Sequence, residues 1–209
     1  MAKIILHKEL FDYDSEIRKK TPVFCGVDEA GRGPLAGDVY AAAVVLSDGV
    51  LIDYLNDSKK ISETRREILY DEIIQKADAY CIATATVEEI DRMNILKATM
   101  LAMKRAVENL GIKPEFALID GNRLPELDIP AEFLVKGDAK SASIAAASVL
   151  AKVARDRYMK GIAQKYPEYC FEQHKGYGTA LHREMLIKYG ASDVHRKTFL
   201  KKILGENND

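Results

Sequence analysis

Short apolar segments rich in β-branched residues alternate with longer segments of helical periodicity along most of this chain. The short segments predict strands near residues 22–28, 38–47, 79–87, 115–120 and 131–136. A loop containing three glycines separates the first two segments, which are close enough in sequence to form an antiparallel hairpin. Strands interleaved with helices predict an α/β domain with a mixed sheet.

Apolar residues that recur every three or four positions predict the helices. These cover residues 62–77, 88–109, a segment from shortly after Asp138 to Lys165, 180–189 and 193–204. Ser62 is a suitable N-cap for the first helix, and Thr86 with Glu89 forms a capping box before the second. The third helix has an alanine-rich first half, so we expect it to lie close against the sheet.

The composition suits one globular domain, since 47% of the 209 residues are apolar and 30% are charged. No apolar run approaches the roughly 18 residues that a membrane span requires. The N-terminus has too short an apolar core for a signal peptide. Cys25, Cys81 and Cys170 are odd in number and widely spaced, which favours reduced core residues over a disulfide framework. We therefore expect a cytoplasmic protein without a membrane anchor.

The net charge of −1 conceals an asymmetry along the chain. Residues 1–135 carry 17 Lys and Arg against 24 Asp and Glu, whereas residues 136–209 carry 14 against 8. A basic C-terminal third is compatible with binding to phosphates. Taken alone, a charge-rich helical C-terminus is more often simply a solvated surface.

Four carboxylates lie where predicted strands end, each close to a glycine. Asp28 and Glu29 end the first strand, Asp120 ends the fourth, and Asp138 lies between the fifth strand and the alanine-rich helix. Hard oxygen ligands of this kind suit Mg²⁺ or Mn²⁺ better than zinc. Two such ions can activate water and stabilise the leaving oxygen in phosphodiester hydrolysis, so the pattern indicates a nuclease.

Two of the four acids also have an ordinary structural explanation. Asp120 begins a common type of turn with Gly121 and Asn122, and Asp138 is a favourable charge before a helix. Asp28 and Glu29 are harder to explain, because adjacent strand residues point to opposite faces and one acid would then be buried. The four together are less easily accidental than any one of them.

At these positions the chain closely resembles ribonuclease HII, the type 2 ribonuclease H family, over roughly residues 22–199. The resemblance rests on the following segments, in order: Asp28-Glu29-Ala30-Gly31-Arg32-Gly33-Pro34-Leu35-Ala36-Gly37, Asp57-Ser58-Lys59-Lys60, Asp120-Gly121-Asn122, Lys136-Gly137-Asp138, Ala145-Ala146-Ala147-Ser148, Arg155-Asp156, His174-Lys175-Gly176-Tyr177-Gly178-Thr179 and His195-Arg196. It implies a ribonuclease H-like fold, with a mixed five-stranded sheet flanked by helices. On that basis we divide the chain into an N-terminal segment (1–21), a catalytic domain (22–170) and a C-terminal helical extension (171–209) that completes the substrate site.

The resemblance also implies roles for individual residues. Asp28, Glu29, Asp120 and Asp138 match the catalytic acids that bind two divalent metals. The backbone of Gly31, Arg32 and Gly33 matches the loop that recognises a ribonucleotide 2′-hydroxyl and its phosphate, and Tyr177 matches the tyrosine that packs on the neighbouring sugar. We add Lys59, Lys60 and Lys175 as candidate phosphate contacts.

The implied activity is cleavage of the RNA strand of RNA–DNA hybrids, and 5′ of single ribonucleotides in duplex DNA, leaving 3′-hydroxyl and 5′-phosphate ends. One alternative is the sister enzyme ribonuclease HIII, which usually has an additional N-terminal domain; residues 1–21 precede the first predicted strand, and we expect no such domain. The other alternative is a hybrid-binding module without catalysis.

Several remaining features favour ordinary interpretations. His174, His182 and His195 are too dispersed in sequence to indicate a metal site. Asp156 suits a local ion pair with Lys152, four residues earlier. The C-terminal residues 198–204 lack the glutamine and paired aromatic residues of a sliding-clamp motif, so we expect no such partner there, and we expect a monomer.

Overall fold

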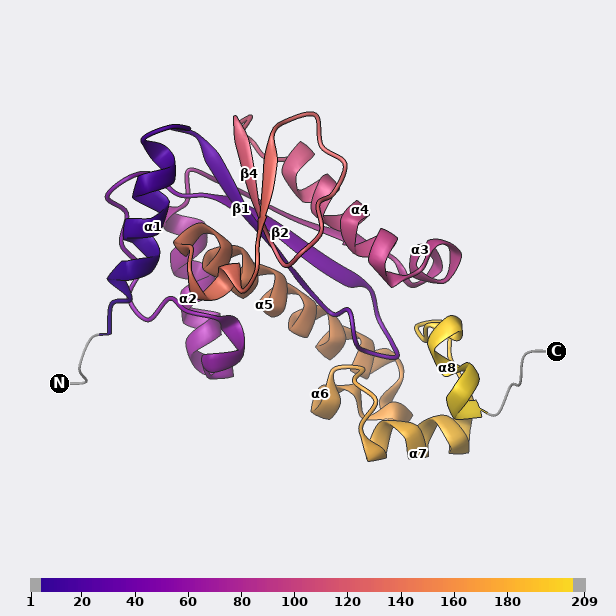
Figure 1. Ribbon diagram of the computed structural model, residues 1–209. Helices are drawn as coiled ribbons and strands as arrows, with labels where there is room; N and C mark the ends of the chain where they lie inside the picture. Colours follow the sequence, from indigo (N-terminus) through magenta and orange to yellow (C-terminus); the bar gives the residue numbers. More distant parts are fainter. Residues whose placement is uncertain (1–4, 205–209) are drawn as a thin grey trace.

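A computed structural model describes residues 5–204 of the chain. A five-stranded sheet lies at its centre, with strand order β3-β2-β1-β4-β5 (Figure 1). The strands are β1 (Phe24–Ala30), β2 (Val39–Val45), β3 (Ala79–Ala85), β4 (Phe116–Asp120) and β5 (Ala131–Leu134). This confirms the five predicted strands and the mixed sheet.

Helices cover both faces of the sheet (Figure 1). They are α1 (Lys8–Arg18), α2 (Glu63–Lys76), α3 (Val87–Met93), α4 (Ile95–Glu108), α5 (Ala142–Lys165), α6 (Phe171–His174), α7 (Ala180–Tyr189) and α8 (Lys197–Leu204), with short 3₁₀ helices η1 (Ser58–Lys60), η2 (Gly137–Ala139) and η3 (Pro167–Tyr169). One apolar core lies between α5, α1, α2 and the sheet, and a second lies between α4 and the opposite face. None of the helices within residues 5–204 is long and apolar enough to cross a membrane.

The strand directions bring the acids to one edge of the sheet. β1 and β2 form the predicted antiparallel hairpin, whereas β1 and β4 are parallel neighbours. β4 is also parallel to β5, so the chain leaves β1, β4 and β5 at the same edge. Residues that follow these strands therefore gather there.

Helix α5 approaches β1 closely at its N-terminal turn. A β-carbon on Gly26 would lie 2.3 Å from the amide nitrogen of Ile144 and 2.3 Å from the carbonyl carbon of Ser143. The buried alanines Ala142, Ala145 and Ala146 continue this contact. The expectation that the alanine-rich helix lies close to the sheet is confirmed.

Asp14 of α1 attaches that helix to the same end of α5. Its carboxylate accepts hydrogen bonds from the backbone N–H and the hydroxyl of Ser143, at 2.8 and 2.7 Å. A carboxylate at this position satisfies a free N–H of the helix terminus and interacts favourably with the helix dipole. Residues 8–18 are thus a packed helix, which the apolar pattern did not predict.

The C-terminal helices pack around the end of α5 and the β1–β2 loop (Figure 1). Phe171, Leu186 and Leu200 form a third apolar cluster with Leu35 and Met159. The glycine loop therefore belongs partly to the core of this C-terminal region.

Three boundaries differ from the prediction. The single helix expected over 88–109 is broken at Asn94, whose φ of 73° separates α3 from α4 and whose side chain caps α4. The last helix begins at Lys197 rather than near residue 193. β1 continues to Ala30, so Asp28 and Glu29 lie inside the strand and not beyond it.

The cysteines follow the expectation only in part. All three are free of disulfides, and Cys25 is fully buried. Cys81 and Cys170 are only partly buried, so they are not core residues in the same sense.

We predict that Gly26→Ala lowers the free energy of unfolding by about 3 kcal/mol or more, because the added methyl group meets backbone atoms that cannot move aside. Gly161→Ala is the matched control, since Gly161 lies in α5 with open space around its β-carbon position. That change should stabilise the protein by about 0.5–1 kcal/mol. Urea denaturation measures both, and equal effects of the two changes would contradict the close contact.

Candidate active site

The four predicted acids gather at the edge where β1 and β4 end. Asp28 is buried and Glu29 half-buried within β1. Asp120 is the last residue of β4, and Asp138 lies in η2, directly before α5. The Asp120 carboxylate accepts a 2.6 Å hydrogen bond from the Gly137 N–H, which ties the end of β4 to η2.

The acids interact electrostatically. Burial and the charges of Glu29 and Asp120 raise the pKa of Asp28 well above its usual range, although the Ser148 hydroxyl opposes the rise. Burial and the charge of Asp120 likewise raise the pKa of Asp138. Carboxylates this close favour protonation or the arrival of a cation.

Lys59 supplies one positive charge at this edge. Its ammonium lies 4.0 Å from a carboxylate oxygen of Asp138, and the charges of Asp28, Asp138, Asp57 and Asp120 raise its pKa. Its side chain is 81% exposed, whereas the side chain of Asp138 is buried. The structure therefore places Lys59, a predicted phosphate contact, next to the acids.

Asp57 is a fifth carboxylate at this edge, and the sequence reasoning did not single it out. Its side chain accepts a 2.9 Å hydrogen bond from the Lys59 N–H and so begins η1. Its charge contributes to the raised pKa of Asp138. Asp57, two residues before Lys59, therefore couples η1 to the acidic edge.

Arg66 of α2 fixes η1 against α5. Its guanidinium donates to the carbonyls of Ser58, at 2.9 Å, and Ile61. It also lies 3.9 Å from Asp156, which is buried and forms the predicted ion pair with Lys152 at 2.6 Å. Asp156 thus pairs with two cations, one of which, Arg66, supports the turn carrying Lys59.

The donor set fits hard divalent cations in its chemistry, since it consists of carboxylate oxygens from two adjacent strands and from η2. Within residues 5–204, no three acid, imidazole or thiol side chains already form a compact metal cage. The charges of the acids nevertheless raise the pKa of Asp28 and of Asp138. A bound cation would relieve the electrostatic repulsion among these carboxylates.

The glycine loop after β1 is held from beneath by Arg196, which is fully buried. Its guanidinium donates to the carbonyls of Gly31 at 2.6 Å, Arg32 at 3.0 Å, Pro34 at 2.8 Å and Gly37 at 2.9 Å. Burial lowers the pKa of Arg196 to about 9. Its hydrogen bonds draw the loop carbonyls inward, toward the guanidinium.

Arg155 of α5 is a second buried guanidinium under this loop. It donates to the carbonyls of Ala36, Asp38 and Lys175, at 3.1–3.2 Å. Gly31 has φ of +97°, and a β-carbon there would lie 2.1 Å from Nε of Arg155. Only glycine permits this backbone shape so close to the guanidinium.

Tyr177 lies beside the outer part of the glycine loop. Gly33 is exposed, and among residues 5–204 the Tyr177 ring carbon Cε1, at 3.8 Å, is the one atom within 4 Å of a β-carbon built on it. The ring also lies 5.7 Å from the Arg155 guanidinium. The Leu35 N–H donates to the Gly176 carbonyl at 2.8 Å, which joins the two loops. The structure therefore brings together the predicted Gly31, Gly33 and Tyr177.

The other predicted substrate contacts, Arg32, Lys60 and Lys175, lie in three different surroundings. Arg32 is 52% exposed, with a guanidinium nitrogen 3.5 Å from Glu29. Lys60 is exposed and lines a separate groove with His7 and Arg65. The Lys175 ammonium donates to the carbonyl of Glu172 in its own segment.

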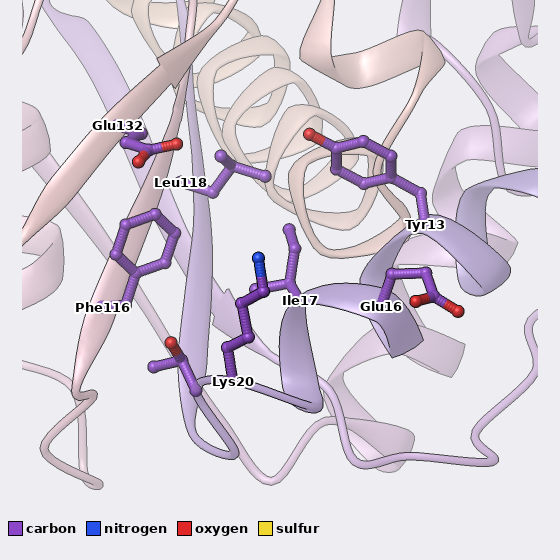
Figure 2. Close-up of a pocket in the computed structure, with 8 residues that line it drawn as sticks. Tyr13, Glu16, Ile17, Lys20, Phe116, Leu118 and Glu132 are labelled. Carbon is purple, nitrogen blue, oxygen red and sulfur yellow. The ribbon is translucent and has the colours of Figure 1, made fainter.

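A mixed polar and apolar hollow lies elsewhere on the molecule. Figure 2 shows it between α1 and the strands, with Tyr13, Ile17 and Lys20 facing Phe116 and Glu132. Phe116 begins β4 and Asp120 ends it, so this hollow lies at the opposite end of that strand from the acidic edge.

Comparison with known families and proteins agrees with this arrangement. A family model described as Ribonuclease HII matches residues 25–202. Ribonuclease HII of Caldicellulosiruptor saccharolyticus is 47% identical over 203 residues, which cover 97% of this chain and 99% of that protein. Ribonuclease HII of Marinomonas sp. is 58% identical, covering 87% and 93% of the two chains.

Solved structures share the fold. The crystal structure of ribonuclease H2 from Pyrococcus horikoshii is 28% identical, with a TM-score of 0.70, covering 88% of this chain and 99% of that one. A ribonuclease HII from Archaeoglobus fulgidus, solved in complex with PCNA, is 29% identical with a TM-score of 0.64, covering 83% and 93%. The structure of Bst-RNase HIII in complex with Mn²⁺ is 17% identical with a TM-score of 0.70, covering 88% and 69%, and supports the fold alone.

The expected ribonuclease H-like fold is confirmed by these neighbours. The matching model covers most of the chain, and the relatives are similar over nearly their whole length. The chain belongs to the ribonuclease HII family, whose members are ribonucleases H and thus endonucleases of the hydrolase class.

Proposed function

We propose that this protein cleaves the RNA strand of RNA–DNA hybrids and cuts 5′ of single ribonucleotides embedded in duplex DNA. The products would carry 3′-hydroxyl and 5′-phosphate ends. The observation that supports this most strongly is the adjacency of two parts: the acidic edge formed by Asp28, Glu29 and Asp120, and the glycine loop that follows directly in the chain.

Asp28, Glu29, Asp120 and Asp138 are the residues that would hold Mg²⁺ or Mn²⁺. Two bound ions would supply the charge that activates the attacking water and stabilises the leaving oxygen. The Ser148 hydroxyl interacts with Asp28, and its oxygen lies 2.8 Å from the Ser58 hydroxyl, so Ser148 links the strand to η1. Lys59 reduces the repulsion among the acids before the ions arrive.

Gly31, Arg32 and Gly33 would recognise the ribose. A 2′-hydroxyl both donates and accepts hydrogen bonds, and it is the group that separates RNA from DNA. With the carbonyls of Gly31 and Arg32 drawn toward Arg196, the exposed Gly33 and the Tyr177 ring form the outer surface of the loop. Lys59, Lys60 and Lys175 are candidates for phosphate contacts.

The alternatives differ in substrate. A ribonuclease HIII-like enzyme would cut RNA tracts, and a binding module would cut nothing. We further propose a cytoplasmic monomer whose C-terminal helix does not bind a sliding clamp, because residues 198–204 lack the expected motif.

We predict nicking at the 5′ side of one ribonucleotide embedded in a DNA duplex, with no cutting of the all-DNA duplex. A denaturing gel of labelled strands measures this in Mg²⁺ and in Mn²⁺. Cutting restricted to RNA tracts would favour the HIII-like activity. Retained binding without cutting of either RNA-containing duplex would favour the binding module.

We predict that Asp28→Asn and Asp138→Asn each reduce cleavage about a thousandfold or more at saturating Mg²⁺, because each removes charge worth several kcal/mol in the transition state. Binding to the hybrid should largely survive in a fluorescence-anisotropy titration. Asp128→Asn, an exposed acid outside the acidic edge, is the matched control and should leave the rate unchanged. Full activity of both site variants would refute the assignment of these acids.

We predict that Gly33→Ala retains the melting temperature but lowers kcat/KM at least about tenfold, because its methyl group stands on the surface that meets the ribose. Gly31→Ala should instead destabilise the fold, since its methyl group collides with buried Arg155. Differential scanning fluorimetry beside the cleavage assay separates the two effects. Normal cleavage by Gly33→Ala would show that the substrate does not approach this loop.

A further inference from the structure

Three histidines that are far apart in sequence converge beneath Tyr177. His174 ends α6, His182 lies in α7 and His195 precedes α8, and all three are buried. The rings of His174 and His182 stack with centroids 4.4 Å apart. Nε2 of His182 lies 3.1 Å from Nε2 of His195. Residues that are dispersed in sequence therefore form one cluster in the fold.

The hydrogen bonds fix the proton on each ring. The Ser192 N–H donates to Nδ1 of His195, at 3.0 Å, so the proton of that ring lies on Nε2 and points to His182. Nδ1 of His182 lies 3.0 Å from the Tyr177 carbonyl, which only accepts, so this nitrogen carries the proton. The bonds therefore run in one direction, from Ser192 through both rings to Tyr177.

The third ring, that of His174, stacks on His182 and forms hydrogen bonds with its own segment of the chain. Nε2 of His174 lies 2.8 Å from the Tyr169 carbonyl, and its Nδ1 accepts from the Gly176 N–H at 3.2 Å. Every ring nitrogen of the three histidines thus has a protein partner, which leaves no free metal-binding position among them. Burial lowers the pKa of His182 and of His195 to about 4, so the rings are neutral at physiological pH.

The ends of this chain of bonds reach both sides of the proposed ribose surface. Tyr177, at one end, carries the ring that borders Gly33. His195, at the other, pairs with Ala36, and the neighbouring Val194 carbonyl accepts from the Gly37 N–H at 2.8 Å. The two rings therefore connect the loop of Tyr177 to the glycine loop through side chains.

We propose that His182 and His195 are positioning residues that hold the Tyr177 backbone at a fixed place relative to Gly33 and thereby set ribose recognition. This inference rests on the proposed function, because it acts through Tyr177. Neither histidine touches the acidic edge, so the effect concerns recognition of the substrate and not the chemistry of the cut.

Two substitutions of His182 distinguish the roles of its two ring nitrogens. The side-chain amide of asparagine reaches roughly the position of Nδ1 and can donate to the Tyr177 carbonyl, whereas that of glutamine reaches roughly the position of Nε2. We expect His182→Asn to retain cleavage of the embedded-ribonucleotide duplex within about threefold. We expect His182→Gln to raise KM and to lower kcat/KM about tenfold or more. His7→Asn, at a histidine outside the cluster, is the control.

A double-mutant cycle tests whether His182 acts through Tyr177. In a Tyr177→Ala background, His182→Gln should have little further effect on kcat/KM. An undiminished loss in that background, or equal behaviour of His182→Asn and His182→Gln, would overturn the inference. Wild-type protein that cuts no RNA-containing duplex would instead overturn the proposed function.

The ring protons are measurable without any substrate or variant. Long-range ¹H–¹⁵N correlation spectra at pH 7 should show His182 protonated on Nδ1 and His195 protonated on Nε2. This measurement keeps the inference testable even where His182→Gln fails to fold. The opposite tautomer of His182 would break the bond to Tyr177 and overturn the inference.

Discussion

The close backbone contact between β1 and α5 is the constraint on which the rest of the site depends. Because Gly26 lacks a side chain, the N-terminal turn of α5 lies directly on the strand that carries Asp28. The same helix places Ser148 next to Asp28 and Arg155 under the glycine loop. It also places Asp156 beside Arg66, which supports η1. A shift of α5 along the sheet would misplace all of these groups together.

Carboxylates precede Ala30 in the chain, and two buried guanidiniums lie under the loop that follows it. The acids before it repel one another, and the guanidiniums of Arg155 and Arg196 lie under the loop after it. A buried guanidinium is costly unless its donors are satisfied, and here loop carbonyls satisfy them. The arrangement therefore shapes the loop and leaves positive charge beneath it, which favours an approaching phosphate. Two of the basic residues in the C-terminal third thus serve the interior and not the surface.

Local patterns predicted the strands, most helices and the grouping of four acids, because these depend on periodicity and on the ends of parallel strands. Asn94 broke a continuous apolar pattern because its side chain caps α4 while its backbone turns to positive φ. Helix α1 escaped prediction since one of its buried positions is the charged Asp14. The buried arginines could not be predicted, because arginine is ordinarily exposed and their partners are carbonyls, which every residue has. The histidine cluster was missed because its contacts join elements whose mutual placement no local pattern specifies.

Recognition and chemistry are joined by a very short length of chain. Glu29 and Gly31 are separated by one residue, and the Arg32 guanidinium lies 3.5 Å from Glu29. Under the proposed function, a ribose held between Gly33 and Tyr177 would bring its phosphate to the acids without any intervening flexible segment. The loop can act in this way only if it is rigid, and the hydrogen bonds from Arg196 and Arg155 supply that rigidity from below. In that proposal, selectivity for ribose would come from the same backbone that sets the distance between the sugar and the acidic edge.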